Sequence, residues 1–316
     1  MFRYFIISFC LALSFSAYAG DDSGVTVEMT PIKVSQHVYY VQGLSGAASS
    51  ANQGFMSNAG FVVTNAGVVV FDTLGTPALA EKLIATIKTI TNQPIKLVII
   101  SHYHADHYYG TQAFKAIGAE IWAHKSGQGH VTSDEAILRL EQRREDLFPW
   151  VDENTKLLPA DKWLDGDYTF KMGEINFELK YIGPAHSPED MAMLVKEDRT
   201  LFSGDLVFKG RVPFVGDADS RLWLKALNNL IASKPKYLIP GHGEASSTPD
   251  KDLKLTREYL TYVRKVMGKA VADFVPFDEA YAKTDWLQFS RLPAFAEANR
   301  ANAYNTYILM EKEALK

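Results

Sequence analysis

Four side chains that can bind a metal ion lie within six residues, in the segment SHYHADH at residues 101–107. They are His102, His104, Asp106 and His107. Two histidines spaced two residues apart would point about 200° away from each other on a helix, whereas zinc-binding histidines on a helix are spaced four residues apart. The segment follows the apolar run Leu97–Ile100, which is typical of a strand buried on both faces. We therefore expect a loop at a strand end that folds several ligands around one point.

The same arrangement recurs three times further along the chain, where an apolar run ends, small or turn-forming residues follow, and a possible ligand comes next. These ligands are His186, Asp205 and His242, after strands expected at 177–182, 200–203 and 237–239. Loops at the ends of sheet strands are where α/β proteins commonly place their sites. A donor set of imidazoles and carboxylates without thiolate suits zinc, iron or manganese. A structural zinc site is closed by four ligands, so seven candidates indicate a catalytic metal centre.

In chain order, His-x-His-x-Asp-His, a later His, a Gly-Asp and a Gly-His-Gly resemble the motifs of the metallo-β-lactamase superfamily over roughly residues 36–245. The resemblance implies an α/β fold, the αββα sandwich, with the site along one edge. It also implies two metal ions. One would be bound by His102, His104 and His186, and the other by Asp106, His107 and His242, with Asp205 bridging the two.

Such a centre would hydrolyse its substrate without a serine or cysteine nucleophile. Two metal ions about 3.5–4 Å apart can hold a hydroxide between them and bind the oxygen of a substrate carbonyl. Zinc lowers the pKa of bound water to about 7. Two zinc ions are therefore the expected cofactors, with iron or manganese as alternatives. Asp106 is the predicted catalytic residue, because the resemblance implies that it orients the attacking water or takes up a proton.

The resemblance leaves more than one function open for a small-molecule substrate. The first is an exported dinuclear zinc hydrolase of an ester, lactone, thioester or β-lactam carbonyl. An Asp at the position of Asp205 is a feature that the chain shares with glyoxalase II and the acyl-homoserine lactone lactonases. Residues 203–215 most resemble exported metallohydrolases found near quinoprotein dehydrogenase and sulfur-oxidation systems. The second is a mononuclear iron persulfide dioxygenase of the same fold, which would use His102, His186 and Asp205. The complete ligand set argues against a third, a catalytically silent binding protein.

The first 19 residues have the features of an export signal. Arg3 is followed by the apolar run Tyr4–Phe15 and by Ala17-Tyr18-Ala19, which has small residues at the two positions that a signal peptidase reads. The run is shorter than the 20 or so residues that span a bilayer. We expect residues 1–19 to be removed and the mature chain to be periplasmic or secreted, with no stable membrane insertion. The only cysteine, Cys10, would be lost with the signal.

Composition points to a globular protein without a nucleic-acid partner. Hydrophobic residues make up 47% of the chain and charged residues 22%, which is typical of a domain with a sizeable core. The net charge is −4, and no run of Lys and Arg forms a stripe that could follow phosphates. We expect residues 20–247 to form the catalytic domain and residues 248–316 a helical C-terminal extension.

The pattern along the chain predicts alternating strands and helices. A hairpin is expected at 59–72, and helices are expected to begin at Thr76-Pro77, Thr132, Ser220, Thr248-Pro249 and Pro293. The loops 43–54 and 125–165 and the C-terminal tail are predicted to form the pocket walls. The resemblance implies that Asp72, which ends a strand, steadies the ligand loop; the alternative is an ordinary turn residue at the strand end. Arg211 is interpreted as a surface residue, with contact to a substrate carboxylate or carbonyl as the alternative.

Overall fold

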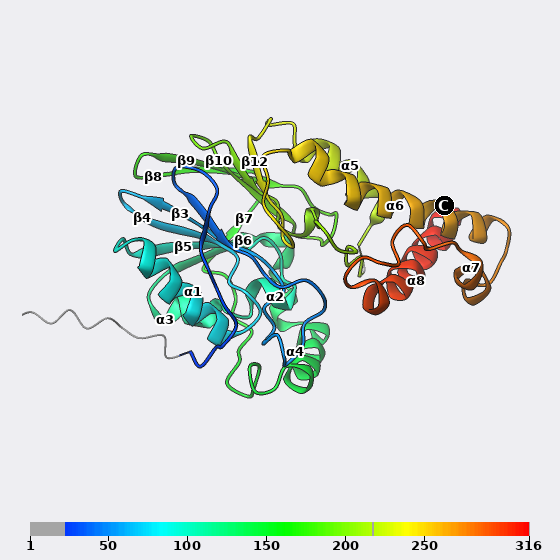
Figure 1. Ribbon diagram of the computed structural model, residues 1–316, viewed down its shortest axis with the longest axis horizontal. Helices are drawn as coiled ribbons and strands as arrows, with labels where there is room; N and C mark the ends of the chain where they lie inside the picture. The colour runs from blue at the N-terminus through cyan, green and yellow to red at the C-terminus, as the bar shows by residue number, and fades with distance from the viewer. Residues whose placement is uncertain (1–22, 217, 316) are drawn as a thin grey trace, which may run out of the picture.

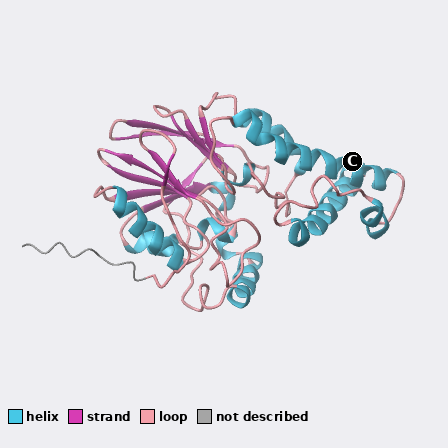
Figure 2. Cartoon of the chain, in the orientation of Figure 1, coloured by secondary structure: helices cyan, strands magenta, loops and turns pink. Residues whose placement is uncertain are grey.

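The computed structural model describes residues 23–216 and 218–315. The predicted signal at 1–19 and Cys10 lie outside the described residues. Two β-sheets are stacked face to face at the centre, helices cover the outer faces, and a group of helices extends to one side (Figure 1 and Figure 2). Within the described ranges, no helix is long and apolar enough to cross a membrane.

The first sheet has seven strands in the order in which they occur along the chain. They are β1 (Ile32–Lys33), β2 (Val38–Val41), β3 (Ala59–Thr64), β4 (Gly67–Phe71), β5 (Ile95–Ile99), β6 (Glu120–His124) and β7 (Lys162–Leu164). Strands β1 to β4 pair antiparallel, and β3 and β4 form the predicted hairpin. Strands β4 to β7 pair parallel, which requires crossover connections between them. The sequence patterns did not predict the two short edge strands β1 and β7.

The second sheet has five strands in the order β12-β11-β10-β9-β8. They are β8 (Tyr168–Met172), β9 (Ile175–Tyr181), β10 (Met191–Val195), β11 (Thr200–Phe202) and β12 (Tyr237–Ile239). Only the β11–β12 pair in this sheet is parallel. The inner faces of the two sheets form one core, where the rings of Phe71 and Phe202 stack with centroids 5.3 Å apart. Burial of each such side chain stabilises the sandwich by about 1.5–3 kcal/mol.

Helices cover the outer face of each sheet. α1 (Pro77–Ile90) begins where predicted, and the Thr76 hydroxyl accepts a hydrogen bond from the N–H of Leu79 at 3.1 Å. α1 and the shorter α3 (Thr111–Ala116) lie on the first sheet (Figure 1). Two predicted helix starts are off by one residue. Ser133, not Thr132, caps α4 (Asp134–Asp146), and Asp219, not Ser220, caps α5 (Ser220–Leu230), because these side chains accept from the first-turn N–H groups.

The C-terminal helices extend away from the sandwich (Figure 1). They are α6 (Pro249–Ala272), α7 (Phe277–Lys283) and α8 (Phe295–Ala314). α6 begins at the predicted Thr248-Pro249 pair. α8 begins two residues later than predicted, because Ala294 before it has a left-handed φ of 63°. The sequence patterns did not predict α7.

Candidate metal centre

All seven predicted ligands follow strands that end at one edge of the sandwich. His102 follows β5, His186 follows β9, Asp205 follows β11 and His242 follows β12. The prediction that residues 102–107 form a loop is only partly correct. Asp106 and His107 belong to the one-turn helix α2 (Ala105–Tyr108), which begins after the extended residue His104. Successive side chains on a helix diverge by about 100°, so the two residues can approach a common point from different directions.

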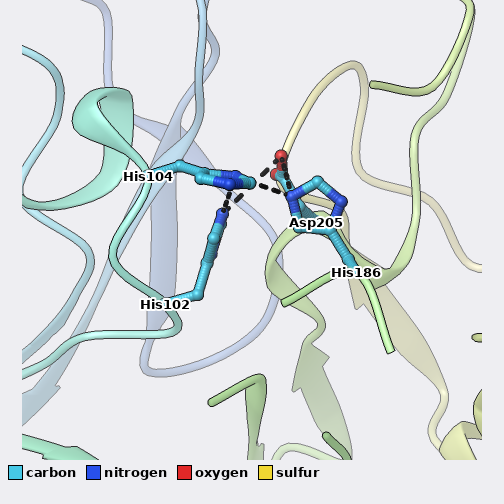
Figure 3. Close-up of side chains that lie close together, drawn as sticks. All are labelled: His102, His104, His186 and Asp205. Atoms are coloured by element: carbon cyan, nitrogen blue, oxygen red, sulfur yellow. Dashed lines mark hydrogen bonds and ion pairs between the residues drawn. The ribbon is translucent and has the colours of Figure 1, made fainter. Parts of the chain in front are cut away.

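The first group of possible ligands is His102, His104, His186 and Asp205, whose donor atoms all lie within 4.8 Å of one another. Figure 3 shows the three imidazoles with their nitrogens turned toward one another. Nδ1 of His104 lies 3.0 Å from Nε2 of His102 and 2.8 Å from Nε2 of His186. Burial lowers the pKa of all three histidines, that of His186 to about 4. They are therefore neutral at pH 7, the form that ligates a metal.

The second group is Asp106, His107 and His242. Oδ2 of Asp106 lies 3.4 Å from Nε2 of His107 and 3.3 Å from Nε2 of His242. Burial alone would raise the pKa of Asp106, but His107 and His242 outweigh it and hold that pKa well below its usual range. The carboxylate is therefore ionised at neutral pH. Asp106 is also the more open carboxylate, with 18% of its side chain exposed against 4% for Asp205.

Asp205 lies within reach of both groups. Its Oδ1 is 3.1 Å from Nε2 of His107, and its Oδ2 is 3.3 Å from Nε2 of His242 and 3.5 Å from Nε2 of His186. Burial would raise the pKa of this carboxyl, but His242 and His107 hold it well below its usual range. The charge of Asp205 is therefore available to both halves of the centre.

Three donor atoms in these groups have surroundings that suit a bound metal ion better than hydrogen bonds to one another. Oδ2 of Asp106, Nε2 of His107 and Oδ1 of Asp205 are buried and have no hydrogen-bond partner, and the same holds for Nδ1 of His186, whose other ring nitrogen faces His104. Buried polar atoms normally have such a partner, and atoms without one in a convergent cluster are what a ligand shell for a cation requires. Imidazole and carboxylate donors suit zinc, iron or manganese. The residues present therefore fit a metal cofactor.

Asp72 steadies the ligand segment, as predicted. Its Oδ1 accepts from the N–H of Ser101 at 2.7 Å, and its Oδ2 accepts from the Ser101 hydroxyl at 2.8 Å and from Nδ1 of His107 at 2.9 Å. This leaves Nε2 of His107 free to face the centre. The carbonyl of Met56 accepts from Nδ1 of His242 at 2.7 Å in the same way, a backbone contact that no sequence pattern signals.

Two further residues beside the centre were wrongly interpreted or overlooked. Arg211 is only 4% exposed, so its interpretation as a surface residue is wrong. Its Nη1 donates to the carbonyl of Gly46 at 2.8 Å and lies 3.4 Å from Nδ1 of His242. The ring of Phe214 lies edge-on against the imidazole of His104, with centroids 5.9 Å apart. Neither side chain stands in a motif, and only the chain's path past the ligands brings them here.

Comparison with known proteins places this geometry in a family. The model of the metallo-beta-lactamase superfamily matches residues 52–242, which include every ligand candidate. The chain belongs to this superfamily. It is similar to metallo-beta-lactamase IND-1 of Chryseobacterium indologenes, with 25% identity over 77% of this chain and 91% of the relative. It is also similar to a hydroxyacylglutathione hydrolase of Haemophilus influenzae, with 27% identity over 52% of this chain and 76% of the relative.

The fold is shared with solved structures. A metallo-beta-lactamase from Pontibacter korlensis superimposes with a TM-score of 0.57 and 23% identity, covering 74% of this chain and 99% of the other. The predicted α/β sandwich with C-terminal helices is thereby confirmed. The predicted enzyme class, a metal-dependent hydrolase of the superfamily, is confirmed as well.

Proposed function

We propose that the chain is an exported, dinuclear zinc hydrolase that cleaves an ester, lactone, thioester or β-lactam carbonyl. The observation that carries this proposal is the position of Asp205 between two groups of ligands, at 3.1 Å from His107 and 3.5 Å from His186. A carboxylate shared in this way is suited to hold two cations together. With a single metal ion, the buried Oδ2 of Asp106 and Nε2 of His107 would remain without any bonding partner.

The residues of the centre then have distinct roles. Zinc ions bound here would lower the pKa of water to about 7 and polarise a substrate carbonyl. His102, His104 and His186 would hold one ion, and His107, His242 and Asp106 the other, with Asp205 shared between them. Asp106 is the proposed catalytic residue, because its ionised and partly open carboxylate can orient a water molecule and accept its proton.

Export and the division of the chain are part of the same proposal. The composition of residues 1–19 supports a cleaved signal, and the end of the family match at residue 242 supports a catalytic domain at 20–247 followed by a helical extension. Mass spectrometry of the protein recovered from the periplasm or medium tests the first point. A mass that lacks residues 1–19 supports cleavage, and a mass that includes Met1 refutes it.

Metal analysis with a substrate panel tests the function itself. We expect two zinc ions per chain and hydrolysis of one carbonyl class among thioesters, lactones and β-lactams, with phosphodiesters and glutathione persulfide as comparisons. His242→Ala should lose one metal ion, whereas His130→Ala, which removes a half-buried histidine outside both groups, should keep both. One iron per chain with oxygen uptake on the persulfide would establish the dioxygenase alternative instead, and less than one metal ion per chain would refute both.

A further inference from the structure

Residues 211–216 form an irregular segment before α5 that belongs to no strand or helix. Its backbone groups therefore need partners outside the sheets, and these partners come from the C-terminal helices and the turn before α8. The N–H of Val212 donates to the carbonyl of Pro293 at 3.0 Å. The N–H of Val215 donates to Oδ1 of Asn302, on α8, at 2.8 Å. The C-terminal helices thus fix the path of a segment that runs past the metal centre.

Asn302 is the centre of this contact. Its Nδ2 donates to the carbonyl of Pro213 at 2.7 Å and to the hydroxyl of Tyr259 at 2.9 Å. That hydroxyl donates in turn to Oδ1 of Asn299 at 2.8 Å. Asn302, Asn299 and Tyr259 are fully buried. Only one orientation of the Asn302 amide satisfies both the N–H of Val215 and the carbonyl of Pro213, so the network specifies a single geometry.

The segment held in this way presents two side chains to the centre. The ring of Phe214 meets the imidazole of His104 at 78°, and the Phe214 side chain remains 36% exposed. Arg211 is tied to the carbonyl of Gly46 at 2.8 Å, which connects the segment to the loop 43–54. Beside Phe214, Gly216 has a φ of 49°, and a Cβ added there would lie 3.0 Å from the Phe214 ring. Phe214 is therefore both placed by its surroundings and open to a ligand.

We propose that Phe214 is a specificity-determining wall of the substrate site and that Asn302 is the positioning residue that holds it against His104. The substrate class that fits this wall carries an aromatic or other flat apolar group next to its reacting carbonyl. An exposed aromatic ring beside a metal ligand favours such a group, because aromatic pairs gain more than their buried area alone provides. This inference rests on the proposed function, since it assigns a part of the substrate that the metal centre would cleave.

Binding without turnover provides the test. Titration calorimetry of the zinc-loaded protein would compare benzyl mercaptan with ethanethiol, because both thiolates bind zinc and only the first carries a ring. In Phe214→Ala we expect the preference for benzyl mercaptan to fall by about threefold to tenfold, the effect of one aromatic pair. Asn302→Ala should show the same fall. The matched control is Phe274→Ala, which truncates a phenylalanine that is 92% exposed between α6 and α7, and it should keep the wild-type preference.

A double-mutant cycle separates positioning from general loss of structure. If Asn302 acts through Phe214, the double variant should show the same preference for benzyl mercaptan as Phe214→Ala alone. A further fall by the factor seen in Asn302→Ala alone would overturn the positioning role. Hydrogen exchange gives a second readout, since the amides of Val212, Phe214, Val215 and Gly216 should exchange faster in Asn302→Ala.

Asn305→Ala keeps the test available if Asn302→Ala does not fold. Asn305 is half-buried, and its Nδ2 donates a single hydrogen bond, at 2.8 Å, to the carbonyl of Gly216. Its loss should lower the preference in the same direction by a smaller factor. An unchanged preference in both Phe214→Ala and Asn305→Ala would overturn the proposal even if carbonyl hydrolysis is found. If these variants lose the preference but the wild-type protein cleaves no carbonyl substrate, the role of Phe214 as a wall would be supported and the proposed function would be rejected.

Discussion

Replacing Asp72 with Asn should weaken one of the two proposed metal ions much more than the other. Through its two oxygens, Asp72 accepts hydrogen bonds from Nδ1 of His107 and from the N–H and hydroxyl of Ser101. An amide has one oxygen, so whichever way Asn turns, its NH₂ meets a donor. The backbone should be undisturbed, because Asn tolerates the left-handed φ of 64° found at this position.

The size of the effect follows from the contact that is lost. A hydrogen bond to a charged group contributes about 1.5–3 kcal/mol, which corresponds to roughly 10- to 100-fold in a binding constant. The affinity of the ion held by His107 should fall by that factor. The other group touches Asp72 only through Ser101, whose hydroxyl lies 2.9 Å from Nδ1 of His102. Its affinity should therefore fall by about fivefold, the effect of one neutral hydrogen bond of about 1 kcal/mol.

Competition with a chelator measures both affinities in one titration. Asp198→Asn is the matched control, because Asp198 also accepts from a histidine, Nδ1 of His37 at 2.7 Å, but lies outside both ligand groups. It should lower stability and leave zinc binding unchanged. Equal losses for the two ions in Asp72→Asn, or a loss in Asp198→Asn, would refute the assignment of Asp72 to His107.

Three further outcomes are expected. Asp106→Asn should lower kcat by about 10²–10⁴-fold with an unchanged circular-dichroism spectrum, and retained turnover would contradict its role. Burial would raise the pKa of Asp198, but hydrogen bonds from Ser35 and His37 outweigh the effect of burial, so the pKa is lowered. The ionised Asp198 therefore stabilises the folded chain fully at pH values above its pKa in the unfolded chain, about 3.9, and this stabilisation is lost as pH falls further. The urea midpoints of wild type and Asp198→Asn should therefore converge below about pH 4. Chelation should lower Tm, since a ligand at 1,000 times its Kd stabilises by about 4 kcal/mol; an unchanged Tm would argue against metal binding by the folded chain.

Local patterns in the sequence were sufficient to predict most strands and helices and to identify the candidate ligands, whereas the sandwich was implied by the resemblance of the ligand motifs to the superfamily. Alternating or continuous apolar runs mark strands such as β4 and β5, and the ligands stand directly after strands. Short elements carry too few residues for such a pattern. β1, β7 and α7 were therefore missed, and the ligand segment was expected to be all loop although α2 lies within it.

The surroundings of the ligands could not be predicted, because they depend on contacts between distant segments. Arg211 follows Lys209-Gly210, a charged residue and a turn-forming residue, which is a pair typical of a surface turn. It is buried because the C-terminal helices hold its segment and because the carbonyl of Gly46, 165 residues away in the chain, accepts its hydrogen bond. Asn302 and Tyr259 lie on different helices, and nothing in their local sequence shows that their side chains meet.

Charge balance explains why this cluster is suited to a cation and not only to packing. Burial would lower the pKa of His107, yet Asp205, Asp106 and Asp72 raise it well above its usual range. The three carboxylates thus place enough negative charge around one buried imidazole to hold a proton on it. A divalent cation at the same point would gain more from those carboxylates than a single proton does, and the His107 lone pair would then serve as a ligand. The group of His102, His104, His186 and Asp205 is suited to a cation for a different reason, because its imidazoles are already neutral and Asp205 supplies the negative charge.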